Sequence, residues 1–226
     1  MKAIEAAVKE ILGTGDGHGF DHVQRVTRMA LEFAQQEGAD LEVVELASLL
    51  HDVDDYKLFG ETYAEGLINA RRILDENNID VDTQGRVLEI IKAMGYSKYL
   101  KGVRPTTLEG AIVSDADMCD AIGAQGILRT HAYNLSRGGD FFDKNIAPSM
   151  DEKTSEQYKS IKTEHAAQHF FDKLLIINSI LMTTPGRDEG ARRQRIMVDF
   201  LVEIFREEGA TEWSDYLQEF ISKSVG

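Results

Sequence analysis

The chain has 226 residues, of which 42% are hydrophobic and 28% charged, a composition typical of a globular protein. Its formal net charge of -14, from 25 basic and 39 acidic residues, argues against binding to a DNA or RNA backbone, which needs a basic surface. No stretch approaches the roughly 18 apolar residues of a membrane span, the first residues lack the pattern of a signal peptide, and Cys119 is the only cysteine. We therefore expect a cytoplasmic protein that has no disulfides and binds neither nucleic-acid polymers nor membranes.

Apolar residues recur at intervals of three and four along most of the chain, which is the period of helices packed on one side. Gly38 is predicted to end one helix and Asp40 to cap the next, while Thr106 and Thr154 each open a capping box. In chain order, helices are expected over residues 21–37, 41–53, 61–75, 84–94, 106–123, 128–135, 154–182, 192–208 and 212–223.

Three segments are expected to be irregular: residues 97–106, 136–153 and 184–190. The second of them has the length of a functional loop. No stretch repeats the two-residue alternation of a half-buried strand, and no hairpin dipeptide such as Asn-Gly occurs. The sequence therefore predicts an all-α fold in a single domain, residues 1–226.

Three groups of histidines and acids interrupt the apolar pattern: His18 with His22, His51 with Asp52, and Asp115 with Asp117 and Asp120. Each group also has a purely structural interpretation. The two histidines can be a chance pair, His51 and Asp52 can cap a helix end, and the three acids can form a solvated face. However, histidines four residues apart share a helix face, and several carboxylates in an apolar helix are costly to bury without a cation. Together the three groups favour a metal site.

Four stretches carry a resemblance to a known family: "GHGFDHVQRV", "LASLLHDVDDYK", "TLEGAIVSDADMCDAIGAQGILRTHAY" and "HFFDKLL". In this order they resemble the HD superfamily of metal-dependent phosphohydrolases, and within it the bacterial branch of YpgQ-like nucleoside triphosphate pyrophosphohydrolases. The resemblance covers about residues 18 to 205. It implies an all-α HD-domain helical bundle with a core over residues 18–135, on which the C-terminal helices of residues 154–223 pack.

Carried over residue by residue, the resemblance implies that the metal ligands are His22, His51, Asp52 and Asp117. Two imidazoles and two carboxylates form a mixed nitrogen and oxygen site that suits Mn²⁺, Mg²⁺, Co²⁺, Ni²⁺ or Fe²⁺. HD relatives with two metals use extra histidines between the His-Asp pair and the last aspartate. None occurs between Asp52 and Asp117, so we expect one divalent ion.

The resemblance also implies roles in catalysis. Asp55 is the first choice for orienting or deprotonating the attacking water, with Asp54 as the alternative, and His18 is a candidate general acid or phosphate ligand. The candidates for binding a phosphorylated substrate are Lys57, Arg25, Lys98, Lys101, Arg104 and Lys173. For all of these cations, an ordinary surface position or a structural ion pair is the alternative.

The expected reaction is hydrolysis of a nucleoside triphosphate to the monophosphate and pyrophosphate by a metal-activated water. Two alternatives stay open: a phosphatase acting on a nucleoside monophosphate or another small phosphorylated metabolite, and a non-catalytic helical module that binds metal or nucleotide. A homodimer is a further expectation. Trp213, Tyr216 and Phe220 would suit its contact surface, although packing in the core explains them as well.

Overall fold

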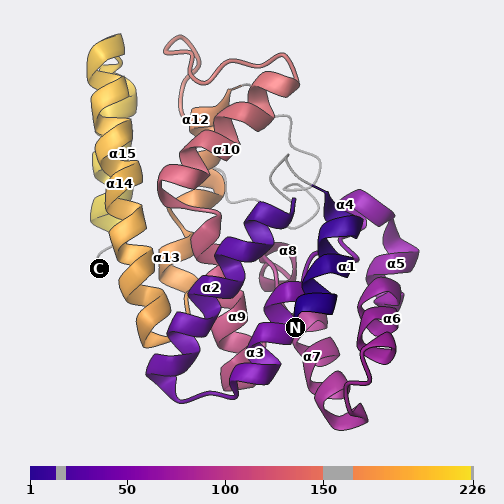
Figure 1. The fold of residues 1–226 in the computed structure, drawn as a ribbon. Coiled ribbons are helices and arrows are strands. Elements are labelled where there is room, and N and C mark those ends of the chain that lie inside the picture. Colours follow the sequence, from indigo (N-terminus) through magenta and orange to yellow (C-terminus); the bar gives the residue numbers. More distant parts are fainter. Residues whose placement is uncertain (14–18, 150–164, 225–226) are drawn as a thin grey trace. The chain divides into compact units, whose positions relative to one another are not determined.

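The computed structural model describes residues 1–13, 19–149 and 165–224, and helices make up its regular secondary structure (Figure 1). The predicted all-α fold is confirmed. The one β-type pairing in the described ranges is an isolated bridge between Asp140 and His165. The chain divides into two compact units, Met1–Met118 and Cys119–Gly226. Every helix in the described ranges is too short or too polar to cross a lipid bilayer.

The first unit is organised around one central helix, α3. That helix packs against α1, α2 and α7, and seven of its ten residues are buried, which explains why its sequence is apolar on most sides. The helices of this unit are α1 (Lys2–Leu12), α2 (Phe20–Glu37), α3 (Leu41–Leu50), α4 (Tyr56–Phe59), α5 (Glu61–Gly66), α6 (Ile68–Glu76), α7 (Val81–Ala93), α8 (Tyr96–Tyr99) and α9 (Leu108–Asp120), the last of which ends in the second unit.

The start of α3 is held by the residue that was predicted to cap it. The Asp40 carboxylate accepts hydrogen bonds from the backbone N–H groups of Glu42 and Val43, at 3.2 and 3.4 Å. Arg86 of α7 also donates to it at 2.7 Å, and this contact lowers the pKa of the Asp40 carboxyl. Gly38 ends α2 in the left-handed conformation, as predicted, with φ 73°. The central helix is therefore fixed at its outer end.

Two element boundaries in the first unit correct the sequence prediction. Residues 61–75 do not form one helix, because Leu67 adopts a left-handed conformation with φ 49° and separates α5 from α6. The helix predicted over residues 84–94 begins earlier, at Val81, because Asp80 caps it by accepting from the Thr83 N–H at 3.0 Å. Both differences arise from backbone conformation and capping that the apolar spacing does not report.

Around the last helix of the first unit, the predicted boundaries are wrong by a few residues. Thr107, not Thr106, caps α9, with its hydroxyl accepting from the Gly110 N–H at 3.1 Å. The same helix ends at Asp120 instead of residue 123. Part of the segment predicted as a loop, residues 97–106, belongs to the short helix α8. Of the expected site residues, Asp117 stays on its predicted helix, whereas Lys98 lies in α8 instead of a loop.

The second unit is built on a long helix, α14, which packs against α10, α13 and α15. Its elements are α10 (Gly123–Ser136), which is longer than predicted, α12 (Ala166–His169), the π-helical segment η1 (Phe170–Leu174), α13 (Ile177–Ile180), α14 (Thr184–Glu208) and α15 (Thr211–Ser224). Trp213 and Tyr216 are 1% and 8% exposed. Their polar atoms donate to the backbone carbonyls of Ile146 and Ser149, so they belong to the core of this unit, and the predicted homodimer cannot use them as its contact surface.

Two further predictions fail in the second unit. Residues 184–190 were expected to break a helix, but they begin one: Thr183 caps α14 by accepting from the Gly186 N–H, and Pro185 lies in the first turn, where its missing N–H has no cost. The single helix predicted over residues 154–182 is replaced, from Ala166 on, by α12, η1 and α13. The Thr154 capping box lies outside the described residues.

The cap of the central helix gives a first prediction. We expect Asp40→Ala to lower the free energy of unfolding by about 1 kcal/mol, because α3 loses its N-cap and Arg86 its carboxylate partner. Urea denaturation monitored by circular dichroism measures this change. Glu10→Ala, at an exposed position of α1, is the control and should change stability by less than about 0.5 kcal/mol. Equal effects of the two substitutions would contradict the capping role of Asp40.

Candidate metal centre

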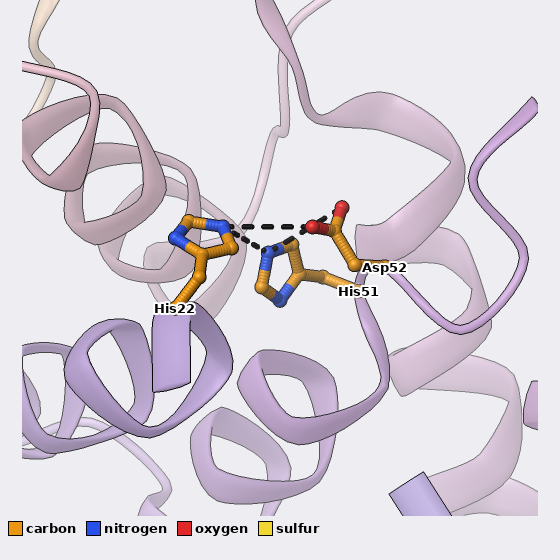
Figure 2. Close-up of side chains that lie close together, drawn as sticks. All are labelled: His22, His51 and Asp52. Carbon is orange, nitrogen blue, oxygen red and sulfur yellow. Dashed lines mark hydrogen bonds and ion pairs between the residues drawn. The ribbon is translucent and has the colours of Figure 1, made fainter. Parts of the chain in front are cut away.

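The four predicted metal ligands converge in the first unit. His22 lies in the first turn of α2, His51 and Asp52 lie in the turn that follows α3, and Asp117 lies on α9. Figure 2 shows the side chains of His22, His51 and Asp52 pointing toward one another. Residues separated by up to 95 positions in the sequence therefore meet at one place because α3 ends in the interior beside α2.

The ligand atoms lie within a narrow range of distances. The Nε2 atoms of His22 and His51 are 3.2 Å apart. His22 Nε2 lies 3.5 Å from an oxygen of Asp52 and 3.4 Å from an oxygen of Asp117. His51 Nε2 lies 3.6 and 3.8 Å from oxygens of the same two carboxylates. Each of the two Nε2 atoms thus lies near one oxygen of Asp52 and one oxygen of Asp117.

The backbone determines which nitrogen of His51 can bind a metal. His51 Nδ1 lies 2.7 Å from the Ser48 carbonyl oxygen, one turn earlier at the end of α3. A carbonyl oxygen can only accept a hydrogen bond, so Nδ1 carries the proton and donates it. In the neutral ring, Nε2 then presents its lone pair toward His22 and the carboxylates. Hydrogen bonds of this kind orient the histidine ligands of metal sites.

This arrangement fits a divalent cation. Neighbouring ligand atoms that bind one ion at about 2.1 Å lie about 3.0–3.4 Å apart, close to the separations found here. The two imidazoles are 3% and 2% exposed, whereas the Asp52 and Asp117 side chains are 12% and 26% exposed. Carboxylates that lie beside the same two imidazoles and are largely removed from water are stabilised by a cation. Asp117 is the most accessible member of the set.

The carboxylate of Asp117 is held in the form that binds metals. Desolvation by itself raises the pKa of the Asp117 carboxyl, but a hydrogen bond with His22 and, when the rings are protonated, the charges of the His51 and His22 imidazoles outweigh it. The pKa of Asp117 is therefore lowered, and the ionised carboxylate is favoured. Within the described ranges, His22, His51 and Asp52 form a group of three side chains close enough to share one ion.

Known proteins resemble this chain over most of its length. Residues 19–122 match the HD domain. The YpgQ protein of Bacillus subtilis is 31% identical over 189 residues, which cover 83% of each chain. The chain belongs to the HD family. A solved structure from Lactobacillus plantarum has a TM-score of 0.78 and 34% identity, covering 93% of this chain and 96% of that one.

Two further structures indicate the activity of the family. An HD-superfamily hydrolase from Bacillus thuringiensis has a TM-score of 0.70 and 28% identity, covering 92% of this chain and 96% of that one. The structure of Bacillus subtilis YpgQ in complex with ADP has a TM-score of 0.66 and 26% identity, over 90% and 97% of the two chains. This protein is thus a hydrolase of the HD superfamily with a site that fits a divalent metal.

The two acids that follow Asp52 in this HD hydrolase differ in their surroundings. Asp54 is 3% exposed, and its two oxygens accept hydrogen bonds from the backbone N–H groups of Asn69 and Ala70, each at 2.9 Å. Desolvation raises the pKa of the Asp54 carboxyl, although these hydrogen bonds act in the opposite direction. Asp55 is partly exposed, and one of its oxygens accepts from the Lys57 N–H at 2.9 Å. Its other oxygen accepts no hydrogen bond from any described residue.

The remaining predicted residues lie in several places. Lys57, on α4, and Lys98, Lys101 and Arg104, around α8, are exposed. The Arg104 guanidinium stacks over the Tyr99 ring at 4.7 Å. Arg25 is partly exposed on α2, three residues after His22. Lys173 is partly exposed in the π-helical segment η1 of the second unit. His18 lies outside the described residues. The structure therefore brings together the four predicted metal ligands, and the substrate-binding roles stay predictions.

The alternative interpretation of the acids on α9, a solvated acidic face, does not hold for Asp115 and Asp120. Asp115 is 1% exposed and Asp120 is 0% exposed, and Asp120 pairs with Arg129 of α10 at 3.5 Å. Sequence reasoning also missed Ser48 and Asn69. Ser48 acts through its backbone carbonyl, so its residue type carries no signal. Asn69 lies 15 residues from Asp54, too far for a spacing argument.

Metal binding is testable without a substrate. Mn²⁺ at about 100 times its dissociation constant should stabilise the folded protein by about 2.7 kcal/mol, because the unfolded chain lacks the assembled ligands. Thermal unfolding of chelator-stripped protein with and without Mn²⁺ measures this effect. Asp52→Ala should lose the response, whereas Asp82→Ala, at an exposed position of α7, should keep it. An unchanged response in Asp52→Ala would disprove the assignment.

Proposed function

We propose that this HD-superfamily hydrolase cleaves nucleoside triphosphates to the monophosphate and pyrophosphate, using one divalent cation. The observation that carries the proposal is the convergence of His22, His51, Asp52 and Asp117 in the first unit. A relative that is 31% identical, YpgQ, has been solved in complex with ADP, which supports a nucleotide as the substrate class. Mn²⁺, Mg²⁺, Co²⁺, Ni²⁺ and Fe²⁺ all suit the mixed donor set.

The ligand residues prepare the site before substrate binds. When bound, a divalent cation supplies Lewis-acid stabilisation of the phosphoryl oxygens and makes water more acidic. The hydrogen bond from His51 to the Ser48 carbonyl keeps the Nε2 lone pair aimed at the other ligands. The Asp117 side chain is 26% exposed and that of Asp52 is 12% exposed. The substrate is therefore proposed to reach the metal from the side of Asp117.

Asp55 is proposed to act on the attacking water. Its free oxygen can accept the water proton while the water oxygen bonds to the α-phosphorus. The bond from that phosphorus to the oxygen bridging to the β-phosphorus then breaks, and this oxygen leaves with pyrophosphate. Asp54 is less suited to this role, because both of its oxygens already accept backbone hydrogen bonds and its side chain is buried.

Cationic side chains are proposed to bind the phosphates. A nucleoside triphosphate is a polyanion, and a chain of net charge -14 repels it unless local cations offset the field. Lys57 follows Asp55 by two residues and its ammonium is exposed. Further proposed contributors are Arg25, Lys98, Lys101, Arg104, Lys173 and His18, the last as a general acid or phosphate ligand.

The reaction itself is tested by its products. Chelator-stripped protein is incubated with the four ribonucleoside triphosphates and Mn²⁺ or Mg²⁺, and pyrophosphate and orthophosphate are assayed separately. We expect pyrophosphate, and we expect Asp52→Ala to abolish its release. Release of orthophosphate alone would favour the alternative of a phosphatase that acts on a phosphorylated metabolite. No product with either metal, although Mn²⁺ binds, would favour the non-catalytic module.

The role of Asp55 gives a separate prediction. Asp55→Asn should lower kcat by a factor of about 10² to 10⁴, because the amide cannot take a proton. The amide oxygen can still accept the Lys57 N–H, so α4 should keep its cap and Mn²⁺ affinity should stay unchanged. Steady-state kinetics with saturating Mn²⁺ measure kcat, with Asp82→Asn as the control. A kcat close to that of the unmodified protein would remove Asp55 from the mechanism.

A further inference from the structure

The turn that carries two metal ligands is joined to α6 by three hydrogen bonds. The Asp54 carboxylate accepts from the Asn69 N–H and the Ala70 N–H, and the Asn69 side-chain amide donates back to the Val53 carbonyl at 2.8 Å. We call these three bonds the Asp54–Asn69 clasp. It connects residues that directly follow the ligand Asp52 to residues 15 or 16 positions further along the chain.

The clasp supplies what the start of α6 lacks. The first N–H groups of a helix have no partner within the helix, and a polar N-cap side chain usually accepts from one of them. Here the N-cap position is Leu67, an apolar residue in a left-handed conformation that makes no side-chain cap. Asp54 accepts from two of these N–H groups instead, and its negative charge lies at the positive end of the helix dipole. The formation of α6 and the position of Asp54 are therefore coupled.

Helix α6 is a firm anchor for this coupling. Ala70, Ile73 and Leu74 on its inner face are fully buried, and the helix packs against α7 and α1. On the ligand side, only Val53 separates Asp52 from Asp54, and the turn is closed further by a backbone bond from the Asp55 N–H to the Asp52 carbonyl. Because neighbouring Cα atoms are about 3.8 Å apart, a fixed Asp54 leaves Asp52 little freedom to move.

We propose that Asp54 and Asn69 are positioning residues for the metal centre, which hold the Asp52 carboxylate at the distance from His22 and His51 that one cation requires. The proposal rests on the metal centre of the proposed function and does not depend on the substrate. Neither residue is one of the four proposed ligands, and both act through the backbone of the ligand turn. The clasp acts by restricting the backbone of the turn, in the way that outer partners of metal ligands restrict their orientation.

Two substitutions weaken the clasp by different amounts. Asn69→Ala removes only the bond to the Val53 carbonyl and leaves the backbone N–H groups in place. Asp54→Asn removes one of the two accepted bonds, because an amide has a single acceptor oxygen. Free Mn²⁺ is measured by electron paramagnetic resonance during titration of the chelator-stripped protein. We expect each variant to bind Mn²⁺ about 10- to 100-fold more weakly than the unmodified protein.

The control variant is Asp80→Ala. Asp80 caps α7 in the same unit by accepting from the Thr83 N–H, and it makes no bond to the ligand turn. It should lower Tm by about 2–4 °C, as the loss of a helix cap does, without changing the affinity for Mn²⁺. If Asn69→Ala lowers Tm as much as the control does but also weakens Mn²⁺ binding, the weaker binding cannot be due to lost stability. It then reports the positioning of the ligand.

Several results would overturn the proposal. If Asn69→Ala and Asp54→Asn lose Tm as the control does but keep the affinity for Mn²⁺, the clasp serves stability alone. If Asp54→Asn keeps that affinity but loses kcat at saturating Mn²⁺, Asp54 acts in catalysis instead. Should Asp54→Asn fail to fold, the titration of Asn69→Ala decides. Absence of Mn²⁺ binding to the unmodified protein would instead remove the metal centre itself, a result distinguishable from the other two.

Discussion

Two imidazoles and two carboxylates meet within 3.2–3.8 Å in the interior of the first unit, and most of the surrounding architecture serves to keep them there. Packing α2 against α3 removes His22 and His51 from water, and α9 adds Asp117. Neighbouring carboxylates in such a place repel each other and lose hydration, so a divalent cation stabilises the arrangement far more than it would at the surface. The burial that forms the core therefore also removes water from these carboxylates, and a bound cation would compensate for that loss.

The central helix α3 shows how the fold delivers a ligand to that place. Asp40 caps its outer end, its apolar sides pack against three other helices, and it stops at Leu50 in the interior. The carbonyl of Ser48, in the last turn of this helix, accepts a hydrogen bond from His51 Nδ1. The end of one helix thus sets the tautomer of a proposed metal ligand.

The three acids between residues 52 and 55 have different surroundings and different roles. Asp52 faces the histidines, Asp54 turns inward to the start of α6, and Asp55 caps α4 with one oxygen and leaves the other open. Their side chains point in different directions because the chain makes a turn here instead of continuing the helix. Identical chemical groups can therefore serve as ligand, anchor and proposed proton acceptor, and only their surroundings distinguish them.

The sequence by itself determined the features that depend on neighbouring residues. Apolar spacing predicted the helical fold, Asp40 and Gly38 marked helix ends, and the spaced motifs pointed to His22, His51, Asp52 and Asp117. Features that depend on distant backbone were decided only by the tertiary structure. Helix α6 begins after Leu67 because Asp54, many residues earlier, accepts its first N–H groups, and His51 takes its tautomer from a carbonyl. Periodicity reports which face of a helix is apolar, but hydrogen bonds between remote segments exist only once those segments have packed.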